Sequence, residues 1–482
     1  MIAAARRKWF ALALLLGVQF MVVLDIAIVN VALPSIQSDL GFSQENLQWV
    51  VSAYALLFGG FLLLGGRIAD LIGRRRVFVV GLVVFTGASL LSGLSWSEGA
   101  LIGARGLQGL GAALITPAAL SILTTTFAEG KERNAALGAW GGVGAFGAVA
   151  GVLLGGVLTD ALSWQWIFFV NVPVGLLGLA LAPLLLTESR DARVKTFDLP
   201  GAVLVTGGLV TLVYGITQAN NNGWGSLETI ALFATAFVVL AAFVVWERRT
   251  AEPLVPFSIF RLRTVVGANV AGLILGTAIF AMFLMLTLYM QQVLHYSPMK
   301  TGVAYLAVAG TAIFWSALGA QLVTRVGVKP VLVAGMTALS AGLIYFTQVS
   351  PHGSYLGDLL PGFLLIAVGL GFSFVPISIA ALAGVQPAEA GLASGLINMS
   401  QQIGGALGIA ALSAIATSTT SDSIVSGTAR AGALTDGFQA AFMGAAAVAL
   451  LGILVALLVV RRADLAVAPE VVEEEATALE AA

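Results

Sequence analysis

The sequence has 482 residues, of which 59% are hydrophobic and only 10% are charged. Soluble proteins carry about 25% charged residues, so this composition excludes an ordinary soluble protein. The net charge of −1 favours neither nucleic acid nor an acidic partner, and the lack of cysteine excludes disulfides, thiolate metal sites and thiol catalysis.

Apolar segments long enough to cross a bilayer, which takes about 20 helical residues, recur along the whole chain. The first, residues 9–33, is too long for the core of a secretory signal, and we expect it to be retained. Thirteen more follow, with short connections: 49–66, 77–97, 100–124, 134–158, 165–187, 200–218, 229–247, 266–292, 301–323, 329–349, 359–382, 391–416 and 439–460. We therefore predict an all-α integral membrane protein with fourteen transmembrane helices.

Basic residues are distributed unevenly between the two alternating sets of loops. Of the 23 Lys and Arg residues, twenty lie in the set that includes both chain ends, two (Lys300 and Arg430) lie in the other, and Arg105 lies inside a span. Because basic loops stay in the cytoplasm, both termini are predicted to be cytoplasmic. The end of the chain, 463–482 with "EVVEEE", is predicted to be an acidic solvated tail.

A weak internal repeat divides the chain. Four pairs share an offset of 254 residues: Gly41/His295, Ser43/Ser297, Gly65/Gly319 and Gly73/Gly327. Three more share 257: Gly138/Gly395, Gly147/Gly404 and Gly151/Gly408. The offset equals eight spans, so we predict a six-helix bundle in 1–190, a two-helix insert with linkers in 191–262 and a second six-helix bundle in 263–462. Parallel repeats of this kind place a substrate site between the halves.

Motifs in a fixed order suggest a family. They are "LDIAIVNVALP" (24–34), "GRIADLIGRRR" (66–76), "LIGARGLQGLGAA" (101–113), "GAVAGVLLGG" (147–156) and "WQWIFFVNVPVG" (164–175). Over residues 9–460 the chain resembles a major facilitator superfamily transporter of the fourteen-helix drug:proton antiporter group. The resemblance implies the major facilitator fold, efflux driven by the proton gradient and no cofactor.

Two of these motifs predict contacts between helices. In the loop motif (Gly66, Asp70, Gly73, Arg74 and Arg75), the resemblance implies that Asp70 latches the two halves. The partial positive charge at the N-terminus of the span that begins near Gly391 is a suitable partner, although an ordinary positive-inside loop explains the same residues. In the antiporter motif, Gly147, Gly151, Gly155 and Gly156 form a smooth face for close packing. Val152 replaces the proline of that motif, so we expect a straighter helix.

Asp25 is the only charge between Trp9 and Leu33, and a lone Asp at this depth costs about 2.5–3.5 kcal/mol. Asp25 and Arg105 lie about nine and seven residues from the outer ends of their spans, roughly 13 and 10 Å deep. Since the resemblance places both helices beside a central cavity, we expect Asp25 to pair with Arg105 when ionised and to take up a proton when the pair loosens. A purely structural Asp25, and an Arg105 that snorkels to the headgroups, are the alternatives.

The sequence leaves the substrate site open. Candidate cavity residues, most of which packing or lipid contact explains better than substrate contact, are Asn30, Tyr54, Gln108, Trp140, Phe280, Phe283, Asn398 and Gln401. A nucleotide-binding loop of the type GxxxxGK[ST] is absent, and His295 and His352 fall in outer loops, so we expect neither an ATP-driven pump nor an enzyme, and no metal site.

Together these features predict a monomeric antiporter in a bacterial plasma membrane whose partners are the substrate, protons and the bilayer, without nucleic acid. It would export lipophilic drugs or toxic compounds, cationic ones included. A dedicated exporter of one endogenous metabolite, antibiotic or lipid is the alternative.

Overall fold

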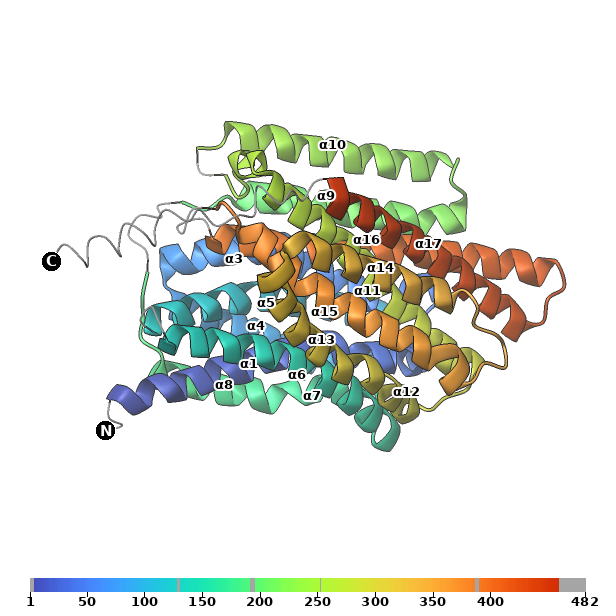
Figure 1. Ribbon diagram of the computed structural model, residues 1–482, viewed down its shortest axis with the longest axis horizontal. Coiled ribbons are helices and arrows are strands. Elements are labelled where there is room, and N and C mark those ends of the chain that lie inside the picture. The colour runs from blue at the N-terminus through green and yellow to red at the C-terminus, as the bar shows by residue number, and fades with distance from the viewer. Residues whose placement is uncertain (1–3, 128–130, 191–195, 252, 386–389, 459–482) are drawn as a thin grey trace.

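The computed structural model describes residues 4–127, 131–190, 196–251, 253–385 and 390–458. Within these ranges the chain is helical apart from short connections, and it contains no strand. Fourteen helical segments in the described ranges are long and apolar enough to cross a membrane. The prediction of an all-α membrane protein with fourteen spans is therefore confirmed (Figure 1).

The helices fall into two halves and an insert. The N-terminal half contains α1 (Ala4–Leu40), α2 (Gln44–Leu47), α3 (Trp49–Ile72), α4 (Arg74–Gly93), α5 (Glu98–Thr126), α6 (Lys131–Ala161), α7 (Trp166–Phe169) and α8 (Asn171–Leu185). The insert contains α9 (Leu199–Asn222) and α10 (Leu227–Arg249), followed by η1 (Phe257–Arg261). The C-terminal half contains α11 (Arg263–Leu288), η2 (Tyr289–Val293), α12 (Pro298–Ala304), α13 (Leu306–Val326), α14 (Val328–Phe346), η3 (Tyr355–Leu359), α15 (Leu360–Leu382), α16 (Ala390–Val425) and α17 (Arg430–Leu458).

Several helices extend beyond the apolar segments from which they were predicted. Helix α1 continues through Pro34 to Leu40, α16 ends at Val425 rather than at 416, and α17 begins at Arg430 rather than at 439. Hydropathy marks only the part of a helix that suits lipid, whereas backbone hydrogen bonding continues into polar sequence such as "TSTTSD". The predicted acidic tail, 463–482, and linker residues 191–195 lie outside the described residues.

The internal repeat is visible as repeated local structure. Gly41 (φ 73°) and its equivalent His295 (φ 53°) both adopt the left-handed conformation, and His295 is the only non-glycine in the described ranges with positive φ. Each is followed by a helix cap in which a serine hydroxyl accepts the backbone N–H three residues on, at 3.1 Å for Ser43 and 3.2 Å for Ser297. The equivalent glycines Gly73 and Gly327 separate α3 from α4 and α13 from α14, again with positive φ.

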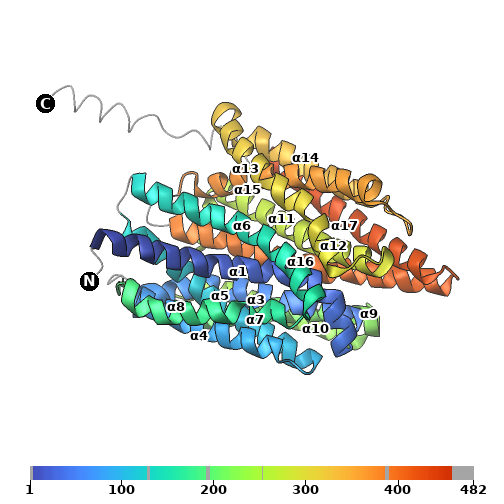
Figure 2. The same cartoon turned by 90° about the horizontal axis from the view of Figure 1, so that it is seen from below.

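Helix packing repeats in the same way. In the N-terminal half α5 lies against α3 and α4, and α6 lies against α1; in the C-terminal half α15 lies against α13 and α14, and α16 against α11. Figure 2 shows the two halves side by side, with α6 next to α1 and α13. The halves meet where α3 packs on α16 and where α6 packs on α12.

The insert covers one side of this interface. Helix α9 lies against α10 and also against α3 and α16, one helix from each half. The Gln48 side-chain amide donates to the Thr217 hydroxyl at 2.8 Å, which ties the start of α3 to α9. Figure 1 shows α9 and α10 along one edge of the molecule, with α10 outermost.

Candidate functional site

A buried carboxylate forms the centre of a polar cluster inside the N-terminal half. Asp25, on α1, is fully buried and accepts three hydrogen bonds from two other helices. Its Oδ2 accepts from Arg105 Nη1 of α5 at 2.7 Å. Its Oδ1 accepts from Gln108 Nε2 of α5 at 2.7 Å and from Asn171 Nδ2 of α8 at 2.8 Å. The ion pair expected between Asp25 and Arg105 is therefore present.

Arg105 is held from several sides and does not snorkel. Its Nε donates to the Val50 carbonyl at 3.0 Å, and its Nη1 also donates to Gln108 Oε1 at 2.7 Å. The guanidinium carbon lies 4.5 Å from the centre of the Tyr54 ring and 5.6 Å from that of Phe168. With only 1% of its surface exposed, Arg105 is a desolvated cation satisfied by a carboxylate, backbone and aromatic faces.

Two members of the cluster were not predicted as site residues. Ser89, on α4, accepts from Gln108 Nε2 and Asn171 Nδ2, both at 3.1 Å, and donates to the Phe168 carbonyl at 2.9 Å. Asn171 is the first residue of α8, directly after the break that follows the short α7. The sequence offered one signal for Asn171, its place in "WQWIFFVNVPVG", and none for Ser89, which looks like any small polar residue in a span.

The geometry suits the ionised form of Asp25. All three groups directed at the carboxylate are N–H donors, so a proton on Asp25 would replace one of these hydrogen bonds with a donor–donor contact. This arrangement holds Asp25 as the acceptor of one ion pair and two amide hydrogen bonds. Because Asp25 is fully buried within one half, a substrate between the halves cannot touch it in this arrangement.

The loop motif makes its contacts within its own half. Arg74 donates to Asp70 Oδ1 through Nε at 3.0 Å and Nη2 at 2.9 Å. Glu188, after α8, accepts the backbone N–H groups of Arg75 and Arg76 at 3.1 and 3.2 Å and so caps α4. Asp70 forms no hydrogen bond or ion pair with α16 among the described residues, and 386–389, just before α16, lie outside them. The latch role of Asp70 remains a prediction, and Gly66, next to Pro117, adds no polar contact.

The glycines of the antiporter motif form close contacts on two sides of α6. A Cβ on Gly147 would lie 3.2 Å from Val23, one on Gly151 2.8 Å from the Leu24 carbonyl oxygen, and one on Gly155 2.6 Å from that of Ile28. These three residues therefore face α1. Gly156 faces the other half, where a Cβ would lie 2.7 Å from the Pro298 carbonyl oxygen. Helix α6 runs unbroken from Lys131 to Ala161, and the straighter course expected with Val152 in place of proline remains a prediction.

The eight predicted cavity residues do not converge on one place. Tyr54 and Gln108 belong to the buried cluster around Asp25. The Asn30 and Asn398 amides donate to carbonyls of their own helices, at 3.1 and 3.2 Å. The others are half-buried: Trp140 beside the N-terminal core, Phe280 next to Gly405, Phe283 against Tyr305, and Gln401 with its carbonyl against Gly276.

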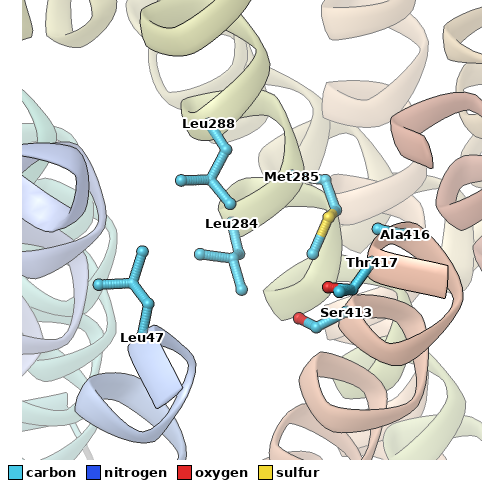
Figure 3. A pocket seen from close by; sticks show the side chains of 7 residues that line it. All are labelled: Leu47, Leu284, Met285, Leu288, Ser413, Ala416 and Thr417. Carbon is cyan, nitrogen blue, oxygen red and sulfur yellow. The ribbon is translucent and has the colours of Figure 1, made fainter. Parts of the chain in front are cut away.

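A pocket between the halves has a different lining. Leu47 of α2 faces Leu284 and Leu288 of α11, and Met285 completes the wall beside three small residues of α16, as Figure 3 shows: Ser413, Ala416 and Thr417. None of the eight predicted cavity residues lines it. The lining is mainly apolar with two hydroxyl groups, and the cavity is about 10 Å³, too small in this arrangement for more than a water-sized molecule.

Comparison with known proteins gives this architecture a family. The chain is 43% identical over 417 residues to the puromycin resistance protein pur8 of Streptomyces alboniger, which covers 86% of this chain and 83% of that protein. It is 42% identical over 421 residues to the cephamycin export protein CmcT of Amycolatopsis lactamdurans, 86% of each chain. A crystal structure of the peptide transporter POT in complex with sulfate shares the fold, with a TM-score of 0.67 and 17% identity over 93% of this chain and 94% of that one. The family model for the Major Facilitator Superfamily matches residues 15–409, and the chain belongs to that superfamily.

Proposed function

We propose that this protein exports small lipophilic compounds of the antibiotic type across a bacterial cell membrane in exchange for protons. Its similarity to a puromycin resistance protein and to a cephamycin export protein supports efflux. Its fourteen apolar helices support a multi-pass membrane location. Uphill export needs a source of free energy, and the chain lacks a nucleotide-binding loop, so the proton gradient is the source we assign.

The observation that carries the proposal is the fully buried pair of Asp25 and Arg105 at 2.7 Å. A buried ion pair contributes little net stability, because desolvation offsets the Coulombic gain. Its retention in the middle of the N-terminal half is better explained by a cycle in which the pair opens and Asp25 binds a proton. One arrangement of the helices then holds the carboxylate ionised, and the other holds it protonated.

Coupling between proton and substrate is indirect in this proposal. Asp25, Gln108 and Asn171 connect α1, α5 and α8 within one half, while α1 also carries the face on which Gly151 and Gly155 pack. A movement of α1 that opens the cluster therefore also moves α6, whose Gly156 meets the other half at Pro298. The proton acts on the contact between the halves, rather than by competing directly with the substrate for Asp25.

The test is uphill export from proteoliposomes under an imposed pH gradient, with puromycin as the first compound. Asp25→Asn should reduce gradient-driven export and the accompanying proton flux to the level of empty vesicles. Exchange of labelled for unlabelled compound without a gradient should persist. Asp39→Asn is the matched control on α1. Asp39 lies outside the cluster and accepts a hydrogen bond of 2.7 Å from Trp164 Nε1. Uphill export by Asp25→Asn at the wild-type rate would show that the carboxylate is structural.

Arg105→Ala is a less informative variant. It should also impair coupling, but it leaves Asp25 buried without its cation, which typically costs about 3–5 kcal/mol. Loss of export would then have to be separated from loss of folded protein, by size-exclusion chromatography of the purified variant.

A dedicated exporter of one compound is the second candidate, and the similarity to a protein named for cephamycin export supports it. A panel of chemically unrelated toxic compounds, tested in an efflux-deficient host, separates the two. Protection against several classes supports broad efflux, whereas protection against one class supports a dedicated exporter. We take the protein to act as a monomer, because its repeat supplies both halves within one chain. Its net charge of −1 favours no nucleic-acid partner.

A further inference from the structure

Two carboxyl groups face one another at one end of the insert. Asp198 caps α9, and Glu247 lies in the last turns of α10; they are 5% and 3% exposed. A Cβ on Gly201 would lie 2.4 Å from Asp198 Oδ2 and 2.6 Å from Glu247 Oε1, so these two oxygens face the same point beside the first turn of α9 and lie at most about 5 Å apart.

Each carboxyl group has one satisfied oxygen and one that lacks a donor. Asp198 Oδ1 accepts from the Gly201 backbone N–H and from Trp246 Nε1, both at 2.8 Å. Glu247 Oε2 accepts from the Val255 backbone N–H at 3.0 Å. The facing oxygens, Asp198 Oδ2 and Glu247 Oε1, have no hydrogen-bond partner among the described residues, although the backbone N–H of Leu254 also lies near the Glu247 carboxylate. A proton on either group would supply that missing hydrogen bond.

The described cations on the surrounding elements form no ion pair with either carboxyl group. The elements packed against α9 are α10, α3 and α16. Helix α10 ends in Arg248, whose guanidinium carbon lies 5.9 Å from the centre of the Phe257 ring, and Arg249. Helix α3 carries Arg67 and Asp70 near its end, and the first turns of α16 carry no titratable group. No described Lys or Arg lies within ion-pair distance of either carboxyl group.

We propose that Asp198 and Glu247 bind one proton between them and form a second protonation site, separate from Asp25. Two buried carboxylates that face one another, with no described Lys or Arg paired to either, each disfavour the charged form of the other, and one shared proton removes one of the two charges. The shared proton joins the start of α9 to the end of α10 and, through Glu247, to the chain at Val255. The ligand of this site is the proton itself, and binding it holds α9 and α10 together at this end of the insert.

The structure offers two closely matched variants. In Glu247→Gln, the amide oxygen can keep the Val255 contact while the NH2 group takes the place of Oε1 and donates to Asp198. In Asp198→Asn, the oxygen can keep the Gly201 and Trp246 contacts while the NH2 group donates to Glu247. Each variant preserves the bridge without a titratable proton. The double variant sets two NH2 groups against one another, so it should be less stable than either single variant.

The first measurement is thermal stability of the full-length protein in nanodiscs, from mildly acidic to mildly alkaline buffer. The folded wild type holds a proton that the unfolded carboxylates release, so its stability should fall as pH rises. Glu247→Gln and Asp198→Asn should both lose this part of the pH dependence. Glu228→Gln, at the other end of α10 and bonded to Asn222, should keep it. Wild-type pH dependence in both single variants would overturn the proposal.

The second measurement is infrared spectroscopy of the same samples at neutral pH. The wild type should show the carbonyl stretch of a protonated carboxylic acid, and each single variant should lose it. Persistence of the full band in both variants would assign the proton elsewhere. Replacing choline with sodium at constant ionic strength tests a metal cation as the ligand. A sodium-dependent rise in the wild-type melting temperature that both variants lose would overturn the proton in favour of that cation.

Discussion

The hydrogen-bond donors around Asp25 stabilise its buried carboxylate together with the ion pair to Arg105. Arg105 was predicted as its partner, but Gln108 and Asn171 supply two of its three hydrogen bonds. Asn171 differs from Asn30, which is also an amide in the N-terminal half but bonds only to carbonyls of its own helix. Comparing the effects of replacing each asparagine therefore distinguishes the stability contributed by a hydrogen bond to Asp25 from that contributed by an amide bonded within its own helix.

Asn171→Ala should destabilise the protein by about 1–3 kcal/mol, because it removes a donor from a buried carboxylate. The control is Asn30→Ala, which should change stability by no more than about 0.5 kcal/mol. Thermal unfolding of both variants in the same detergent provides the comparison. Equal effects would mean that Asn171 contributes packing rather than charge stabilisation.

Asp70→Asn should impair export while leaving the protein inserted at normal levels. The amide can still accept from Arg74, but it lacks the charge that the latch role requires. Glu132→Gln is a suitable control, because Glu132 pairs with Lys8 at 2.7 Å on the same side of the molecule. The measurement is the transport rate in vesicles, normalised to protein content. A normal rate for Asp70→Asn would show that Asp70 acts only as a local partner of Arg74.

At the scale of elements, the close contact between α1 and α6 depends on glycines, which have no side chain to keep the two helices apart. Gly155 brings the Ile28 carbonyl oxygen to within 2.6 Å of the position that a Cβ would occupy. Gly144, on the same helix, has no neighbour within 4 Å of that position. The close approach therefore belongs to the motif glycines and not to α6 as a whole.

Gly155→Ala should push α6 from α1 and cost about 1–3 kcal/mol, the range for overpacked sites. Gly144→Ala should be neutral or stabilise the helix by about 0.5–1 kcal/mol, because alanine loses less backbone entropy than glycine. Unfolding midpoints for the two variants make the comparison. A neutral Gly155→Ala would show that α1 and α6 can separate without loss of stability.

For the molecule as a whole, the uneven distribution of basic residues predicts its orientation in the membrane, which the fold alone does not. Twenty of the 23 basic residues lie in one set of loops, so both termini should be cytoplasmic. Reporter fusions after residue 222, at the end of α9, and after residue 462 should report outside and inside, respectively. The same side for both fusions would contradict the assigned topology.

The sequence predicted the span number, the repeat and the Asp25–Arg105 pair because each leaves a signal along the chain. Apolar length marks a span, equal offsets mark a repeat, and a charge in an apolar helix is conspicuous. Ser89 and Glu188 left no such signal, since small polar residues in spans and acids in loops are common. Asp198 and Glu247 lie at helix ends 49 positions apart, and only tertiary packing reveals that they face one another.

The position of the insert gives the molecule a front and a back with respect to lipid. At the back, α9 lies across the meeting line of α3 and α16, and α10 stands outside it. At the front, α6 and α13 present Phe146 and Phe314, 60% and 62% exposed, directly to the surroundings. The insert therefore covers the line where α3 meets α16, whereas the opposite contact between the halves is made by α6 with α12 and α13. An otherwise symmetric pair of bundles thus has two unlike interfaces, one of them covered by a third layer of helices.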